Sequence, residues 1–386
     1  MISGVKMDTY TLSVIGFFLI VAAFIYFDRK KIEHSYFVLF MRRTKRFGDL
    51  INSITNISPK TWKVFYTIGI LIGILAMIYG IIMITSVSSA ILSGQIDQAA
   101  AKLILPSFSA EESIGEYSVN IPFWTWILVI ALILVPHELS HGIAARADKV
   151  RLKSVGLMLL AIFPGAFVEP DEKQLARKPL MTRLRVFCAG TYMNFIVAGI
   201  AILLLSFIVF PLMFQPGVQL QAVDADSPAE LAGLTNQTIL THINSIPITI
   251  TYSELVQQNY FADEIGEVVA GQEIQFTDSE GNNYNIVLEE KNSSSYMGIL
   301  YAPIPTKDPL YAAIADFLTK LWMFSFAVAI FNMLPIGPLD GGLVFQSLTD
   351  KYIGGPSAKK IQKWASMISL ILVIFMFFGA NIMGLI

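Results

Sequence analysis

The stretch that decides the fold is residues 122–145, PFWTWILVIALILVPHELSHGIAA. It is apolar and long enough to cross a bilayer as a helix, which takes about 20 residues. Near its end it carries three ionisable side chains, His137, Glu138 and His141. A charged residue in mid-membrane costs roughly 2.5–3.5 kcal/mol, so such residues usually have a function there. The stretch therefore predicts a membrane-spanning helix that carries a site.

The composition of the whole chain agrees with a membrane protein. Of its 386 residues, 54% are hydrophobic and 15% are charged, far from the averages of soluble domains. The lone cysteine, Cys188, excludes a disulfide framework and a cysteine-based metal site within one chain. We expect the lipid bilayer as the surroundings of this protein and no nucleic acid as a partner.

Apolar stretches elsewhere predict further spans. Four more occur at about 10–27, 64–87, 186–214 and 365–386. A sixth, 310–348, holds a short apolar run that is interrupted by Pro335, Gly337, Pro338, Asp340, Gly341 and Gly342. Backbone that is not helical at membrane depth must be buried or line a polar cavity, so we predict a broken span at a site. The expected fold is a polytopic α-helical membrane protein with about six transmembrane helices, one of them broken at the active site.

The distribution of lysine and arginine predicts the orientation. These residues concentrate in segments 28–63, 146–185 and 346–363, whereas 88–121 and 215–309 together hold three lysines. The positive-inside rule places the three basic segments in the cytoplasm. With six spans, both chain termini are then extracytoplasmic, and the site lies nearer the cytoplasmic face of the cell membrane.

Residues 215–305 differ in composition from the spans around them. They contain short alternating runs and a turn segment at 278–283, which is typical of a small soluble β-rich domain. The opening at 219–234, QLQAVDADSPAELAGL, resembles a PDZ domain of the protease-associated type. The likeness breaks at 236–238, where Asn-Gln-Thr replaces the usual Gly-Asp before the next strand. We therefore expect an inserted, extracytoplasmic PDZ-like domain.

The spacing of the two histidines fits a metal site. Residues four apart lie on one face of a helix, so His137 and His141 can occupy adjacent corners of a zinc tetrahedron. Glu138, beside the first histidine, can reach a metal-bound water as general base. Because catalytic zinc sites generally take three protein ligands, a third ligand must come from elsewhere.

The candidates for the third ligand are four carboxylates: Asp340, Glu169, Asp171 and Glu172. We prefer Asp340, because it lies in the break at membrane depth and the glycines beside it allow close backbone approach. The remaining histidines, His34 and His242, fall in segments that the expected topology keeps away from the site.

Three segments together resemble the site-2 protease family of intramembrane metalloproteases: HELSH at 137–141, GTYMN at 190–194 and NMLPIGPLDGG at 332–342. Their order along the chain and the inserted domain also fit that family. The resemblance implies a zinc metalloendopeptidase that hydrolyses peptide bonds within transmembrane segments of membrane-tethered proteins. It further implies substrates that another protease has already trimmed.

The resemblance also implies roles for single residues. The zinc ligands are His137, His141 and Asp340. Glu138 is the general base, and Asn194 and Asn332 help hold the substrate strand or the transition state. A hydrogen bond between helices explains Asn194 equally well. Residues 151–170 resemble the family's membrane-embedded hairpin, which pairs with an unwound substrate by strand addition. The alternative for this segment is an ordinary interfacial loop. Two imidazoles and a carboxylate also suit iron(II), cobalt or manganese, so the metal type stays open.

Two other functions fit the sequence. One is a membrane zinc hydrolase that acts on another small amphiphile, and the other is a non-enzymatic membrane scaffold or transporter that presents the PDZ-like domain. Glu138 separates enzyme from scaffold, because a structural zinc site needs ligands but no base.

The predicted layout has five parts along the chain. Residues 1–121 hold two spans and their loops, and 122–214 form the first part of the catalytic membrane core. The PDZ-like domain at 215–305 separates it from the second part at 306–350. Residues 351–386 hold a cytoplasmic loop and the last span.

Overall fold

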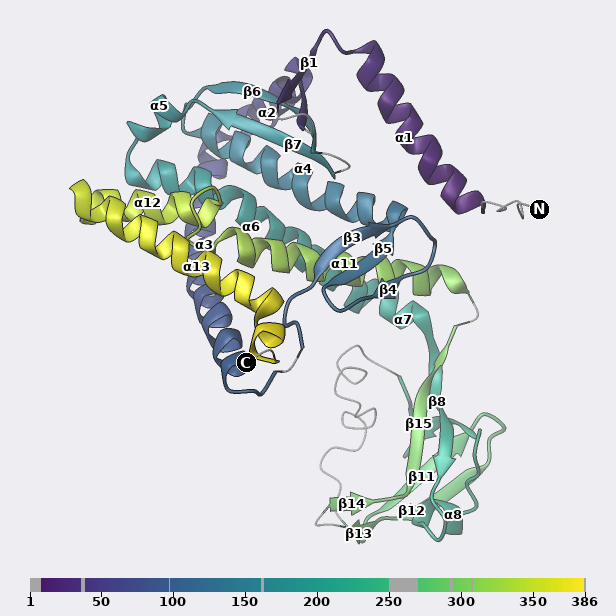
Figure 1. Ribbon diagram of the computed structural model, residues 1–386. Helices are drawn as coiled ribbons and strands as arrows, with labels where there is room; N and C mark the ends of the chain where they lie inside the picture. The colour runs from purple at the N-terminus through teal and green to yellow at the C-terminus, as the bar shows by residue number, and fades with distance from the viewer. Residues whose placement is uncertain are drawn as a thin grey trace. The chain divides into compact units, whose positions relative to one another are not determined.

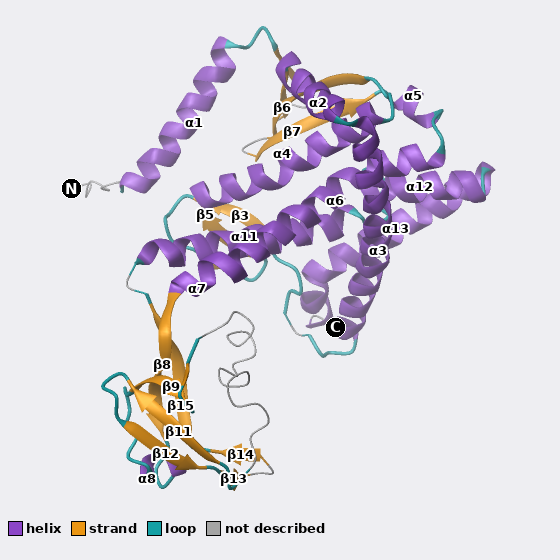
Figure 2. Ribbon diagram, turned by 180° about the vertical axis from the view of Figure 1, so that it is seen from behind, coloured by secondary structure: helices purple, strands orange, loops and turns teal. Residues whose placement is uncertain are grey.

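The computed structural model describes residues 8–35, 39–96, 98–160, 163–249, 270–291, 294–306 and 308–384. The chain forms two compact units: the first is Met1–Gly199 with Lys320–Ile386, and the second is Ile200–Thr319. We call them the helical unit and the strand unit, after the elements that dominate each of them (Figure 2).

Among the described residues, six helices are long and apolar enough to cross a membrane. They are α1 (Thr9–Phe27), α3 (Pro59–Leu92), α4 (Phe123–Ala147), α6 (Leu180–Leu204) with its continuation, α11 (Pro309–Asn332) and α13 (Gly355–Gly384). The continuation of α6 is a π-helical turn, η1 (Leu205–Val209), followed by α7 (Phe210–Met213). These helices fit the polytopic membrane protein that the sequence predicted.

The stretch predicted as one broken span at 310–348 forms two helices, and the break between them overlaps the interruption predicted at 335–342. α11 runs without interruption, and its 24 residues give a helix of about 36 Å, which can span a membrane alone. The break at 333–339 follows this helix, and α12 (Asp340–Tyr352) is a separate helix that packs on α13. The prediction underestimated only the helix before the break, because Lys320 shortened the apolar run. In the structure its ammonium pairs with Glu112 at 2.7 Å, which lets the helix carry this charge.

Side-chain caps mark the starts of α2 (Lys45–Ile57) and α3, and α4 contains a proline in its interior. Ser58 caps α3 by accepting a hydrogen bond from the Thr61 N–H, and a proline occupies the first turn, where its missing N–H costs nothing. Thr44 caps α2 through the Arg46 N–H. α4 continues through Pro136, directly before His137, although proline removes one backbone hydrogen bond there.

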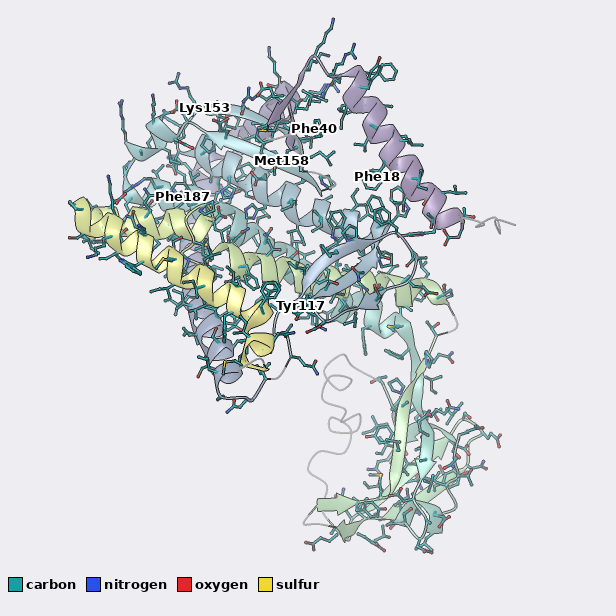
Figure 3. All side chains as sticks on the ribbon, in the orientation of Figure 1. Phe18, Phe40, Tyr117, Lys153, Met158 and Phe187 are labelled. Atoms are coloured by element: carbon teal, nitrogen blue, oxygen red, sulfur yellow. The ribbon has the colours of Figure 1, made fainter. Side chains whose placement is uncertain are left out.

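A four-stranded antiparallel sheet in the helical unit lies beside α2 and α4 (Figure 1). Its strands, in spatial order, are β1 (Ile32–Ser35), β2 (Leu39–Arg43), β6 (Leu152–Leu160) and β7 (Phe163–Pro170). Lys153 and Met158 lie on β6 and Phe40 on β2 (Figure 3). Because Gly156 has no side chain, β6 can approach the Arg42 backbone on β2. The hairpin expected at 151–170 is thus formed by β6 and β7, and β7 is the edge strand of the sheet.

A second, smaller sheet leads directly into α4. It consists of β3 (Leu103–Ser107), β4 (Ser113–Ile114) and β5 (Ser118–Pro122), in the order β3-β5-β4. A short helix, α5 (Glu172–Ala176), follows β7 and is capped by the side chain of Asp171. These elements connect the spans of the helical unit.

The strand unit is built around a sheet in the order β12-β11-β9-β8-β15, with β10 paired to β9. Its elements are β8 (Phe214–Val223), α8 (Pro228–Leu231), β9 (Ile239–Ile243), β10 (Ile246–Pro247), β11 (Glu273–Asp278), β12 (Asn283–Val287) and β15 (Ile299–Pro305), with the separate pair β13 (Glu289–Lys291) and β14 (Ser294–Tyr296). Fully buried apolar side chains such as Val218, Leu240 and Phe276 form its core. A β-rich domain therefore lies where the sequence predicted one, and its PDZ type stays a prediction.

A buried ion cluster fixes the end of α4. Asp148, directly after this helix, accepts hydrogen bonds from Arg185 of α6 at 2.7 and 2.9 Å and lies 3.2 Å from Lys63 Nζ of α3. Burial by itself raises the pKa of the Asp148 carboxyl, but the two cations more than offset this and hold the pKa below its ordinary value. The cluster ties three spans together beside the helix that carries the candidate site.

Replacing Asp148 with asparagine is expected to destabilise the detergent-solubilised protein by roughly 3 kcal/mol near neutral pH, because two cations lose their counter-charge. Since folding lowers the carboxyl pKa, its stabilisation is fully present above the unfolded pKa of about 4 and is lost as the pH falls through the lower folded-state pKa. The Tm difference between wild type and Asp148→Asn should therefore shrink in acid. Asp49→Asn, at an exposed position of α2, is the control and should change Tm little at any pH. A Tm difference that persists undiminished in strong acid contradicts the prediction.

Candidate active site

α4 places His137 and His141 one turn apart on the same helix face. Their ring centroids lie 4.8 Å apart, and their Nε2 atoms approach each other to 3.2 Å. Both rings are nearly buried, with side chains 6% and 12% exposed. Two imidazole nitrogens that point at each other in this way need a proton or a cation between them.

Asp340, the first residue of α12, completes the group. Its Oδ2 lies 3.4 Å from Nε2 of His137, and its Oδ1 lies 3.4 Å from Nε2 of His141. Ligand atoms at about 2.0–2.1 Å from a tetrahedral zinc ion are about 3.3 Å from one another. The observed spacings therefore match the ligand shell of such an ion. Among the described residues, His137, His141 and Asp340 are the one group of three side chains found that could hold a metal ion.

Two glycines allow the Asp340 segment to fold against the end of α11. A Cβ atom on Gly341 would overlap with the Met333 backbone, and one on Gly342 would overlap with the Ile336 backbone. Only glycine leaves room at these positions for the 333–339 turn to close on the first turn of α12. The N-terminal end of α12 also favours the Asp340 carboxylate through the helix dipole.

α6 passes directly behind the two imidazoles. A Cβ atom at Gly190 would lie only 2.5 Å from Nε2 of both His137 and His141. A side chain there would crowd the space in which a metal bound by both nitrogens must lie. The two nitrogens, the carboxylate and this open space together fit a three-ligand metal site.

α6 also contacts the outer side of each proposed ligand. His141 Nδ1 lies 2.7 Å from the Val186 carbonyl oxygen, and His137 Nδ1 lies 3.1 Å from Nδ2 of Asn194. Thr191 donates a hydrogen bond from Oγ1 to Oδ2 of Asp340 at 3.4 Å. Sequence reasoning missed Val186 and Thr191. The threonine could have been found, because it lies inside the GTYMN segment, but no sequence signal marks a backbone carbonyl.

Glu138 is half-buried beside His137 and is held by the edge strand. Its Oε2 accepts a hydrogen bond from the Val168 N–H of β7 at 3.1 Å. Sequence reasoning missed this contact as well, since it joins positions thirty residues apart through a backbone group. The contact fixes one carboxylate oxygen of Glu138 and leaves the lone pairs of the other for a proton or a water molecule.

The other carboxylates considered as third ligand lie elsewhere. Glu169 accepts a hydrogen bond from Ser154 at 2.7 Å, Asp171 caps α5 through the Gln174 N–H, and Glu172 is the first residue of α5. None of these three carboxylates belongs to the group around the histidines. The structure therefore favours Asp340 among the four candidates.

The two predicted substrate-binding residues differ in their exposure to solvent. Asn332 is the last residue of α11 and is half-buried, whereas Asn194 is fully buried. The substrate-binding role of both stays a prediction. His34 lies in β1, and His242 lies in β9 of the strand unit, where its Nδ1 is 3.0 Å from Oγ1 of Thr241.

A cavity of about 400 Å³ borders the site. Its lining includes Val168, which contacts Glu138, Leu343, one turn after Asp340, and Phe187 of α6 (Figure 3). The polar part of the lining consists of Glu169, Glu172, Arg183, Gln346, Ser347 and Asp350. The cavity thus lies next to residues that contact or follow site residues.

Comparisons with known proteins agree with this geometry. The sequence matches Peptidase family M50 over residues 125–376. It is 30% identical over 295 residues to an uncharacterized protein of Methanocaldococcus jannaschii, which covers 75% of this chain and 73% of that protein.

Two further relatives carry functional names. A membrane-bound transcription factor site-2 protease homolog of Arabidopsis thaliana is 30% identical over 129 residues, which are 32% of this chain and 25% of that protein. A putative zinc metalloprotease of a Nostoc species is 26% identical over 211 residues, covering 46% of this chain and 57% of that protein. The site and the apolar helices thus define a membrane metalloprotease class. The chain belongs to peptidase family M50, and the resemblance to the site-2 protease family is confirmed.

Alanine at Gly190 is expected to weaken zinc binding roughly 10-fold or more, because the added Cβ crowds both imidazoles. Gly199→Ala is the matched control on the same helix, since a Cβ there meets no atom within 4 Å. Metal content by mass spectrometry and competition with a chelator measure the effect, with His137→Ala and Asp340→Ala as variants that lose the metal. Equal zinc affinity in Gly190→Ala and Gly199→Ala would contradict the prediction, because it would show that a Cβ at position 190 does not crowd the metal site.

Proposed function

We propose that this protein is an intramembrane zinc metalloprotease of the site-2 protease type, which hydrolyses peptide bonds within transmembrane segments of membrane-tethered proteins. The observation that carries the proposal is a three-ligand group, two of its members on the apolar helix α4, with a carboxylate beside it. His137, His141 and Asp340 supply the ligands, and Glu138 supplies the base. A three-ligand site leaves a fourth position for the reaction, as catalytic zinc sites do.

The ligands would hold one zinc ion per chain. When bound, zinc supplies a Lewis acid for the scissile carbonyl and makes a water molecule more acidic. Glu138 takes a proton from this water and delivers it to the leaving amine nitrogen. A C–O bond forms as the C–N bond of the peptide breaks, so no other reactant is needed. The Val168 N–H keeps the Glu138 carboxylate oriented during both proton transfers.

The substrate must be unwound before it can react, because the carbonyl groups of a helix are hidden in backbone hydrogen bonds. β7 offers a suitable partner for the unwound segment, since it is an edge strand and its Val168 touches Glu138. Asn332, half-buried at the end of α11, would contribute a further hydrogen bond to the substrate. The proposed substrates are transmembrane proteins that another protease has already trimmed.

Water is needed inside the bilayer for this reaction. The cavity beside the site, whose lining includes Arg183 and Glu169, supports a route for water to the site. The same side would release the products. The scaffold alternative leaves both this cavity and the Glu138 contact unexplained.

Conservative replacement of the base tests the proposal most directly. Glu138→Gln keeps the shape of the side chain but cannot accept a proton, so cleavage of a reconstituted single-span substrate should fall about 10²–10⁴-fold. Zinc content is expected to stay at the wild-type level, because Glu138 is not among the ligands. Glu111→Gln is the control, since this carboxylate is exposed and lies outside the ligand group and the cavity lining. Wild-type cleavage by Glu138→Gln would refute the proposed mechanism.

The proposal includes an orientation, which the distribution of lysine and arginine supports. Both termini and the PDZ-like domain at 215–305 would be extracytoplasmic, with the site nearer the cytoplasmic face. Cysteines introduced at exposed positions check this in intact cells: Lys45→Cys in α2 should resist a membrane-impermeant thiol reagent, and Glu230→Cys in α8 should react. The opposite labelling pattern would reverse the orientation.

A further inference from the structure

One helix supplies an outer partner to each of the three proposed ligands. Along α6, the Val186 carbonyl oxygen faces His141 Nδ1, the Thr191 hydroxyl faces Asp340 Oδ2, and the Asn194 amide faces His137 Nδ1. Positions 186, 190 and 194 are four residues apart and therefore share one helix face. Gly190 occupies the middle of that face, where the imidazoles come closest.

The proton on each imidazole decides whether its Nε2 can bind a metal. A neutral imidazole carries one N–H, and the other nitrogen provides the lone pair. The Val186 carbonyl can only accept, so it places the proton of His141 on Nδ1 and leaves Nε2 available to a metal. His137 also presents Nε2 to the site, so it too needs an acceptor at Nδ1.

Asn194 has one acceptor end and one donor end at this position. With Nδ2 toward His137, its carbonyl oxygen Oδ1 is buried without a hydrogen-bond partner among the described residues. A half-turn of the amide, which hardly changes its shape, presents Oδ1 to the His137 Nδ1–H instead. That orientation satisfies the buried oxygen and gives His137 the same protonation that Val186 gives His141.

We propose that Asn194 is a positioning residue that accepts a hydrogen bond from His137 Nδ1–H, fixing the tautomer and ring orientation in which Nε2 binds the metal. This inference rests on the metal site of the proposed function. It gives Asn194 a role other than contact with the substrate, because its side chain is fully buried against a ligand. Asn332, which is half-buried, keeps the predicted substrate contact.

Two substitutions at Asn194 test whether this residue accepts or donates the hydrogen bond with His137 Nδ1. Asn194→Asp retains the size and offers only acceptors, so zinc affinity should stay within a few-fold of wild type or rise. Asn194→Leu has the same branched arrangement of side-chain atoms but no acceptor, so zinc affinity should fall about 10–100-fold, the usual effect of losing such a partner. Asn332→Leu is the control outside the group and should leave zinc affinity unchanged.

Zinc affinity is measured on the purified full-length protein by chelator competition, without any substrate. The absorption spectrum of the cobalt-substituted protein reports the ligand geometry, which should be altered in Asn194→Leu and preserved in Asn194→Asp. If the aspartate variant loses zinc as the leucine variant does, Asn194 does not act as an acceptor and the inference is wrong. Wild-type zinc affinity in Asn194→Leu, with a raised KM for a membrane substrate, would return Asn194 to substrate binding.

The same measurements distinguish a failure of this inference from a failure of the proposed function. A wild-type protein that binds no metal even when zinc is supplied overturns both. Normal zinc binding with the predicted Asn194 pattern, but no proteolysis of any transmembrane substrate, overturns the protease and leaves the role of Asn194 supported. The aspartate variant keeps the inference testable if the leucine variant does not fold.

Discussion

Two imidazoles and a carboxylate meet within 3.4 Å of one another in a nearly buried position among apolar helices, and most of the site depends on this contact. Polar groups removed from water must satisfy one another or bind an ion, because apolar surroundings offer no other partner. α4 supplies the two imidazoles, and α12 brings the carboxylate of Asp340 from a distant part of the chain. The turn at 333–339, with the glycines that follow it, is the means by which α12 reaches the histidines.

α6 carries none of the proposed metal ligands but packs against all three of them. It leaves space at Gly190 and provides hydrogen-bonding groups at Val186, Thr191 and Asn194. Arg185 of the same helix holds Asp148 at the end of α4, so the ion cluster and the outer contacts fix α6 against α4. A metal site needs such support, because small shifts of a ligand ring change affinity as strongly as the loss of a contact.

β7 connects the candidate base to the surface on which a substrate would lie. Val168 binds the Glu138 carboxylate through its backbone N–H, and the strand has an unpaired edge in the sheet. Under the proposed function, an unwound substrate segment would pair with the edge of β7. Because Val168 of β7 also holds Glu138, this pairing would fix the position of the substrate relative to the base. Under the same proposal, water would approach through the adjoining cavity.

The sequence alone determined the local patterns: spans of apolar residues, the helical spacing of His137 and His141, and the glycines beside Asp340. These are set by periodicity and steric limits that act over a few residues. The tertiary structure decided which carboxylate joined the histidines, and it paired Lys320 of α11 with Glu112. It also placed the Val186 carbonyl and the Val168 N–H at the site. Backbone groups are the same at every residue, so only the packing of distant segments can show which of them have a role.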